Sequence, residues 1–244
     1  MSGVTPEKHR SDRAAVLRES ADRLISAHRG QHHFQPEPGT GPRDEAEALV
    51  VQAMVAAALG PVGGFKTGRR SALDPPTVAP VLAADVVASG AAIDPAASRL
   101  RGVELEIAFR LECETPDTDD PAFDDRLADA VVALPALEIV ESRLTDPEAA
   151  GPLWKRADAQ INGGIVLGAP VADWRGLPLS SPTVRKAFDG RILVDGAVAA
   201  PGGCPFATFA AFARGLGTHC GGLRAGQVVI TGSLTGLPFA PPGT

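Results

Sequence analysis

The stretch that decides the fold class is Val103-Glu104-Leu105-Glu106-Ile107-Ala108-Phe109-Arg110-Leu111. Apolar and polar residues alternate along it, and this period of two predicts a β-strand with one buried face. Two residues along a strand advance by ~6.6 Å, so Glu104 and Glu106 point the same way and can both reach one ion. Two like charges held together need a cation between them, or one must take up a proton. The alternative is a solvated strand face that carries no function.

Composition limits what the chain can do. Its 244 residues are 44% hydrophobic, which is enough for a core in one domain or in one domain with a small appendage. A net charge of -6 leaves no basic surface for nucleic acid. Three cysteines, Cys113, Cys204 and Cys220, match no zinc site and predict reduced thiols in a cytoplasmic protein. No apolar run is long enough to cross a membrane, and Met1 to Arg13 lacks the apolar segment of a signal peptide.

Helical periodicity dominates the first quarter of the chain. Apolar spacing predicts one helix from Thr5 to His28 that stops at Gly30, and a second from Asp44 to Leu59, with Asp44 and Glu47 as a capping box. Beyond it the texture changes to short apolar runs separated by glycine and proline. The sequence therefore predicts a helical N-terminal part at residues 1–60 and a β-rich catalytic domain at residues 61–244.

The later segments alternate strands with few helices. A third helix is predicted from Phe123 to Leu134, stopped by Pro135, and a short one after Pro205. Residues 188–191, Phe-Asp-Gly-Arg, are typical of a hairpin turn, and residues 226–232 of a strand that runs into a polar turn. Strands with little helix between them, after an all-helical start, predict an α+β fold with a mainly antiparallel or mixed sheet.

Three further residues stand out by their surroundings. Lys66 lies in a glycine-rich segment, residues 62–68, that lacks the spacing of a phosphate-binding loop. Asp85 interrupts an apolar run, where an aspartate is either an edge residue or a buried functional carboxylate. Glu138 is flanked by Leu137 and Ile139, and a carboxylate inside an apolar segment needs a partner or a metal.

Taken together, these segments resemble the fumarylacetoacetate hydrolase superfamily, in its 2-oxopent-4-enoate hydratase and 4-oxalocrotonate decarboxylase branch. The resemblance runs from the helical start to nearly the last residue. It rests on the order and spacing of six short segments: Gly64 to Gly68, Leu82 to Asp85, Val103 to Ala108, Leu134 to Arg143, Ala157-Asp158 and Val229 to Gly232.

The resemblance implies a β-rich mixed-sheet roll with a small helical N-terminal part. It also implies a magnesium or manganese ion held by Glu104, Glu106 and Glu138, a ligand set of hard oxygen atoms that suits either metal. The remaining implied site residues are the catalytic Lys66 and Asp85 and the substrate-binding Asp158 and Thr231.

The implied activity is the metal-dependent hydration of a 2-hydroxydienoate of the 2-oxopent-4-enoate type to a 4-hydroxy-2-oxo acid, as part of aromatic catabolism. A decarboxylase of an oxalocrotonate-type 2-oxo diacid is the first alternative, because both reactions use the same electron sink. The second is a non-catalytic subunit that pairs with an active homologue. The expected partners are the small 2-oxo acid and further copies of the chain.

The sequence departs from the family pattern in four places. Ala159 stands where the family reads Asn after Ala-Asp, Arg69-Arg70 replaces a threonine expected after the lysine, and Cys204 replaces a histidine. The sequence ends at Pro241 to Thr244, where the resemblance implies a further pair of strands. An edge left open in this way must be covered, which motivates the alternative of a partner subunit.

Overall fold

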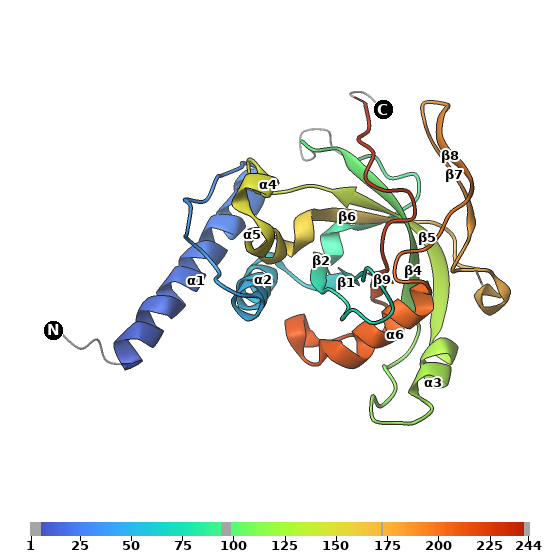
Figure 1. Ribbon diagram of the computed structural model, residues 1–244, viewed down its shortest axis with the longest axis horizontal. Helices are drawn as coiled ribbons and strands as arrows, with labels where there is room; N and C mark the ends of the chain where they lie inside the picture. Colours follow the sequence, from blue (N-terminus) through green and yellow to red (C-terminus); the bar gives the residue numbers. More distant parts are fainter. Residues whose placement is uncertain (1–5, 94–98, 172, 242–244) are drawn as a thin grey trace. The chain divides into compact units, whose positions relative to one another are not determined.

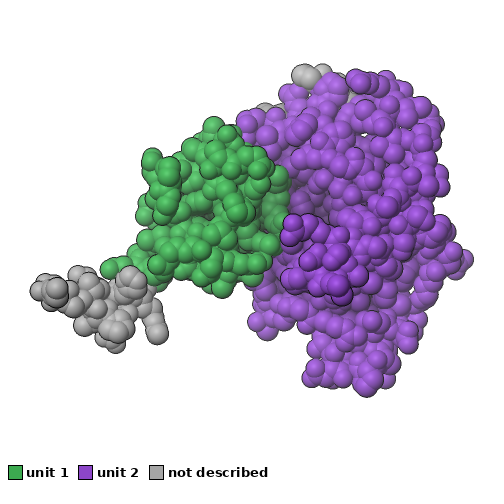
Figure 2. All heavy atoms as spheres, in the orientation of Figure 1, with its two compact units in different colours: residues 1–61, 142–161 green, residues 62–141, 162–244 purple. Residues whose placement is uncertain are grey.

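The computed structural model describes residues 6–93, 99–171 and 173–241 (Figure 1). The predicted helix start at Thr5 and the last three residues lie outside this range. The chain forms two compact units (Figure 2): unit 1 contains Met1–Pro61 and Ser142–Ile161, and unit 2 contains Val62–Glu141 and Asn162–Thr244. Residues 142–161 thus group with the helical start, whereas the sequence places them in the β-rich part. The division into domains at residue 60 stays a prediction.

Unit 1 is helical. It contains α1 (Pro6–Gly30), α2 (Glu45–Leu59), α4 (Pro147–Ala150), α5 (Pro152–Ala157) and the short 3-10 turn η2 (Ala159–Ile161). The predicted second helix is confirmed, because the Asp44 carboxylate accepts the Glu47 N–H at 2.8 Å and Gly60 follows the last turn. Its buried core is apolar and includes Leu17, Leu24, Val51, Leu144 and Trp154.

Unit 2 is built on a seven-stranded sheet. Its strands are β1 (Val62–Lys66), β2 (Ala79–Leu82), β3 (Val86–Ala88), β4 (Gly102–Leu111), β5 (Val131–Val140), β6 (Asn162–Leu167) and β9 (Val228–Ile230). They lie in the order β2-β1-β9-β4-β5-β6-β3. The pairs β1–β9 and β3–β6 are parallel and the other pairs antiparallel, so the sheet is mixed.

The two outermost strands force this sheet to curl. β2 and β3 stand at opposite edges, yet only the three-residue turn η1 (Ala83–Asp85) separates them in the chain. Both edges must therefore meet, and the sheet becomes a roll. Small and aliphatic side chains fill its interior, among them Val81, Ala108, Leu134, Ala136, Ile165 and Ile230. The predicted α+β fold with a mixed-sheet roll is confirmed.

The outer face of the sheet packs on aromatic side chains. The helix α6 (Pro205–Leu216), predicted after Pro205, and the shorter α3 (Phe123–Asp129) contribute most of this layer (Figure 1). Phe109 of β4 stacks on Phe209 of α6 with ring centroids 5.3 Å apart. The core continues through Phe65, Phe212 and Trp174. Aromatic rings bury large apolar areas, so this layer anchors the roll.

β4 follows the predicted alternation, but both of its faces are covered. Ile107, Phe109 and Leu111 belong to the outer core. Ala108 and Glu106 lie on the inner face and are 0% and 1% exposed, because the roll closes over them. The alternative of a solvated strand face is therefore wrong for Glu106.

The predicted third helix is too long. It ends at Asp129, and residues 131–134 begin β5 instead, paired with β4 from Val131↔Leu111 to Val140↔Gly102. Sheet pairing overrides the local helical spacing here, and Val131 and Val132 are β-branched. The Gly168 N–H, one residue past the end of β6, donates to the Pro135 carbonyl at 2.9 Å. Proline cannot return this bond, and the β5–β6 ladder ends there.

A separate two-stranded hairpin completes unit 2. It consists of β7 (Thr183–Phe188) and β8 (Arg191–Ala197). The predicted turn is confirmed: Asp189 and Gly190 both have positive φ, 46° and 80°, which matches the right-handed twist of a hairpin. Among the helices described, none is both long and apolar enough to span a membrane.

Prediction: replacing Ala159 with asparagine should stabilise the protein. Ala159 has φ 47°, in the left-handed region where a side chain clashes with the backbone and where asparagine is better tolerated. We expect the free energy of unfolding to rise by roughly 0.5–1 kcal/mol in denaturant titrations. Ala159→Gly should gain as well, whereas Ala149→Gly, in the exposed part of α4, should lose stability. Equal losses from both glycine variants would contradict the explanation.

Candidate metal centre

Three glutamates converge on the inner face of the roll. In the register of β4 and β5, Glu104 lies directly opposite Glu138, and Glu106 follows two residues later on the same face. One carboxylate oxygen from each lies within 4.8 Å of the others. Like charges opposite each other destabilise neighbouring strands. The cluster therefore needs positive charge to persist.

Donors from three other strands surround the glutamates. Lys66, at the end of β1, places its Nζ 2.7 Å from Glu138 Oε1. Asn162, at the start of β6, donates its Nδ2–H to the same oxygen at 2.9 Å. The backbone N–H of Gly232, just after β9, donates to Glu106 Oε2 at 2.6 Å. The closure of the roll brings these strands together around one set of carboxylates.

Burial makes these charges costly. It raises the pKa of Glu106 well above the usual range, and the charge of Glu138 raises it further. Burial also raises the pKa of Glu138, although the ammonium group of Lys66 opposes this change. For Lys66, burial alone would lower the pKa, but the surrounding glutamates raise it above its ordinary value. The site thus favours a charged lysine and resists three ionised glutamates.

The residues fit a hard divalent cation. Glu138 is 0% exposed, and its Oε2 has no hydrogen-bond partner among the described residues. A buried carboxylate oxygen in that state is destabilising unless a further ligand satisfies it. Three carboxylates and no His or Cys form a donor set that suits magnesium or manganese. Glu104 is partly exposed, which leaves one side of the cluster open.

Asp85 lies elsewhere in unit 2. It ends η1 and lines a cavity of about 250 Å³ together with Glu141, Ile139 and Gly163. None of the three glutamates is among the residues that line this cavity. The catalytic role of Asp85 stays a prediction.

Asp158 forms a buried ion pair inside unit 1. It is buried, and its carboxylate accepts hydrogen bonds from Ser142 Oγ at 2.8 Å and from Arg143 Nε at 2.5 Å. Burial raises the pKa of Asp158, and the charge of Arg143 offsets part of that effect. The ion pair stabilises unit 1. The expected contact of Asp158 with a substrate stays a prediction.

Thr231 fixes the turn beside Glu106. Its Oγ1 donates to the Ile107 carbonyl at 2.8 Å, and its neighbour Gly232 holds the Glu106 carboxylate. The predicted contact of Thr231 with substrate is untested. Sequence reasoning did not single out Asn162 or the Gly232 N–H as site groups. Neither a single asparagine side chain nor a single backbone N–H has a recognisable sequence motif.

Comparisons with known proteins find relatives by sequence and by structure. No family model matches the chain. The chain is 33% identical over 147 residues to 2-keto-4-pentenoate hydratase from Paraburkholderia xenovorans (strain LB400), which is 58% of this chain and 52% of that protein. The values are the same for 2-keto-4-pentenoate hydratase 3 from Pseudomonas putida. The chain thus spans about half the length of the curated relatives it matches.

Solved structures share the fold over a longer range. 4-Oxalocrotonate decarboxylase from Pseudomonas putida G7, complexed with magnesium and adipate, matches with a TM-score of 0.73 at 20% identity, covering 100% of this chain and 93% of that one. Fumarylpyruvate hydrolase from Pseudomonas aeruginosa, in complex with Mn²⁺ and pyruvate, matches with a TM-score of 0.51 at 17% identity, covering 86% of each chain. The resemblance to the fumarylacetoacetate hydrolase superfamily, in the hydratase and decarboxylase branch, is confirmed.

Prediction: Glu106→Gln should separate the metal-free protein from the metal-bound one. The change removes one of three mutually repelling charges, so without metal the variant should be at least as stable as the parent. With magnesium or manganese it should lose most of the stabilisation that the parent gains, which is about 2.7 kcal/mol at a free metal concentration of 100 times Kd. Melting temperatures with and without metal measure both effects.

The matched control is Glu112→Gln, which removes the same charge from the surface. Glu112 is exposed and pairs with Arg110 at 2.6 Å. This variant should keep the full metal-induced shift. An identical shift in the parent, Glu106→Gln and Glu112→Gln would exclude Glu106 as a ligand.

Prediction: pH should move stability and metal affinity in opposite directions. Because the pKa of Glu106 is raised in the folded protein, its stabilising contribution is present below the unfolded pKa and is lost as pH rises through the folded pKa. Metal needs the ionised carboxylate, so its affinity should rise over the same window. Calorimetric titration of magnesium at several pH values between about 5 and 8 tests this. A constant affinity would contradict it.

Proposed function

We propose that this chain is a divalent-metal-dependent lyase. The proposal starts from the fold that the chain shares with the fumarylacetoacetate hydrolase superfamily. Its proposed reaction is the hydration of a 2-hydroxydienoate of the 2-oxopent-4-enoate type to a 4-hydroxy-2-oxo acid. The proposed metal is magnesium or manganese, held by Glu104, Glu106 and Glu138. The carrying observation is the convergence of these three glutamates beside Lys66, with Glu138 Oε2 left without a partner.

The cluster suits a substrate that carries a carboxylate next to an oxygen atom. When bound, the metal would supply Lewis-acid stabilisation of the negative charge that develops on that oxygen. Lys66 contributes a second, permanent positive charge, because its raised pKa keeps it protonated. Its 2.7 Å contact with Glu138 fixes the position of that charge in advance. Lys66 therefore stabilises the dienolate electrostatically and is a poor general base.

The remaining residues of the site orient the carboxylates. Asn162 holds Glu138, and the Gly232 N–H holds Glu106, each through one oxygen, and the second oxygen of Glu138 has no partner among the described residues. Preorganised groups of this kind need little rearrangement during the reaction. Asp85 was predicted to be catalytic, but it lines a cavity that none of the three glutamates lines, and the proposal does not depend on it.

A decarboxylase is the second candidate function. The solved structure of 4-oxalocrotonate decarboxylase shares this fold along the whole described chain. The same electron sink serves loss of carbon dioxide from a 2-oxo diacid, since negative charge develops on the same oxygen in both reactions. Release of carbon dioxide from an oxalocrotonate-type diacid distinguishes this candidate, because a hydratase releases none.

Prediction: the purified protein should consume a 2-hydroxydienoate in the presence of magnesium. The conjugated dienoate absorbs in the ultraviolet, so loss of absorbance follows the reaction, and a chelator should abolish it. Lys66→Met removes the fixed charge and should lower kcat by roughly 100-fold or more, as loss of one preorganised donor does.

Lys155→Met is the matched control. Lys155 belongs to α5 in unit 1 and pairs with the exposed Glu148 at 2.8 Å. Its activity should equal that of the parent. Unchanged absorbance across a panel of mono- and dicarboxylic dienoates, with and without metal, would refute the proposed activity.

A further inference from the structure

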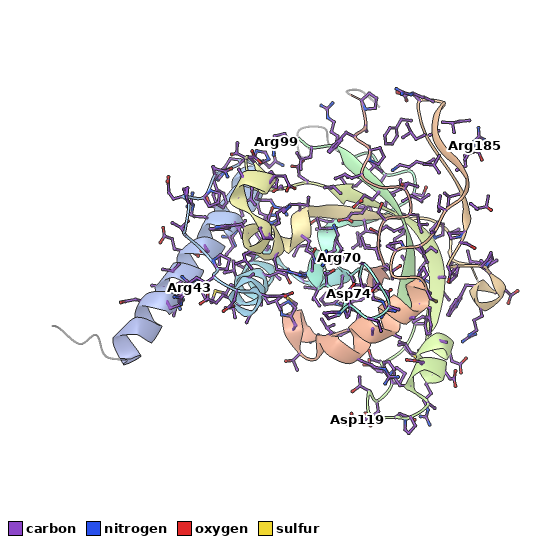
Figure 3. The ribbon with its side chains drawn as sticks, in the orientation of Figure 1. Arg43, Arg70, Asp74, Arg99, Asp119 and Arg185 are labelled. Carbon is purple, nitrogen blue, oxygen red and sulfur yellow. The ribbon has the colours of Figure 1, made fainter. Side chains whose placement is uncertain are left out.

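A lysine is the most deeply buried residue of the β7–β8 hairpin. Along the described hairpin, Lys186 is 5% exposed, whereas its neighbours are exposed or partly exposed. Arg185, labelled in Figure 3, lies on the outward face and is 3.6 Å from Asp195 of β8. The register shifts directly after Lys186, so that Leu193 has no partner. Such a bulge redirects a side chain, and bulges are frequent beside functional sites.

A gap in a strand ladder holds the ammonium group of Lys186. The Val103 N–H donates to the Pro238 carbonyl at 3.0 Å, and antiparallel pairing would return a bond from residue 238 to the Val103 carbonyl. Proline has no N–H and cannot supply it. Lys186 Nζ donates to this carbonyl instead, and it lies 3.4 Å from Thr235 Oγ1. Two acceptors thus fix its position, and the Nζ also lies 5.5 Å from the centroid of the Phe188 ring. The third N–H has no hydrogen-bond acceptor among the described residues.

The charge of Lys186 has no counter-ion within ion-pair distance in the described part of the chain. Burial lowers the pKa of Lys186 to about 8, and the negative charge of Glu104 opposes this effect. Most buried cations in proteins are paired with an anion, because burying an unpaired charge is strongly destabilising. An anionic group of a ligand would supply the missing charge.

Lys186 lies at the open side of the glutamate cluster. The carbonyl that it binds belongs to the residue before Glu104, and Glu104 is the partly exposed member of the three. Glu106 and Glu138 form the closed side, next to Lys66 and Asn162. A 2-oxo acid whose carboxyl end occupied the cluster would extend past Glu104, toward the carbonyl that Lys186 binds.

We propose that Lys186 is a specificity-determining residue that binds the second carboxylate of a dicarboxylic 2-oxo acid. This inference rests on the proposed function, since it takes the three glutamates as the place where the 2-oxo acid end of the substrate binds. It narrows the substrate class to diacids, which favours the oxalocrotonate-type diacid of the second candidate function over the monocarboxylic 2-oxopent-4-enoate type. A charge-assisted bond from the third N–H of Lys186 to that carboxylate completes the pairing of the buried ammonium.

Prediction: two six-carbon ligands test this inference, 2-oxoadipate and 2-oxohexanoate, which differ in one terminal carboxylate. Calorimetric titration at saturating magnesium should show that the parent binds the diacid roughly tenfold more tightly. Lys186→Met should bring the two affinities to within about twofold of each other by weakening only the diacid. Lys186→Arg, which keeps the cation, should retain most of the preference. Arg185→Met, on the outward face of the same hairpin, should bind both acids like the parent.

The outcomes are distinct. A parent that binds magnesium and both acids equally overturns the inference alone, and so does a Lys186→Met protein that loses affinity for both acids equally. A parent without any metal-induced stabilisation overturns the proposed function as well. If Lys186→Met does not fold, Lys186→Gln keeps a donor for the Val103 carbonyl without the charge. A diacid preference that survives this change also overturns the inference.

Discussion

The repulsion among three glutamates inside a closed roll is the constraint on which unit 2 depends. A carboxylate on β4 faces another on β5, and neither Glu106 nor Glu138 has contact with bulk water. An apolar pair at these positions would stabilise the sheet better, since buried charges retain a desolvation cost even when paired. Lys66, Asn162 and the Gly232 N–H offset part of that cost. The orphaned Glu138 Oε2 shows that the compensation within the described chain is incomplete.

Local sequence patterns predicted the secondary structure correctly where an element depends mainly on its own residues. The alternation in residues 103–111 gave the strand and its two faces, and the caps at Asp44 and Gly60 gave α2. The same reasoning failed where pairing with a neighbouring strand determines the secondary structure. Residues 131–134 have helical spacing, yet the ten-residue ladder with β4 draws them into β5. Local propensity is a weak preference that a long ladder overrides.

The site was only partly visible in the sequence for the same reason. The spacing of Glu104 and Glu106 on one strand was visible in the sequence, and Lys66 and Glu138 stood out by their surroundings. The family resemblance was needed to assign all four to one site. Asn162 and the Gly232 N–H have no local signature, because they reach the cluster only through the curl of the sheet. Lys186 escaped notice because its burial depends on a bulge and on Pro238, more than fifty residues further along the chain.

The parallel pairing of β1 with β9 has a consequence for how the protein folds. Residues 64–66 pair with residues 228–230, so the contact closes a loop that contains almost all of unit 2. The entropic cost of such a closure must be met before the pairing contributes anything, which slows folding of topologies with distant contacts. Lys66 is in β1 and Gly232 follows β9 by two residues, so both groups reach the glutamates only when these two strands pair. The topology therefore predicts that the three carboxylates stay hydrated until late in folding.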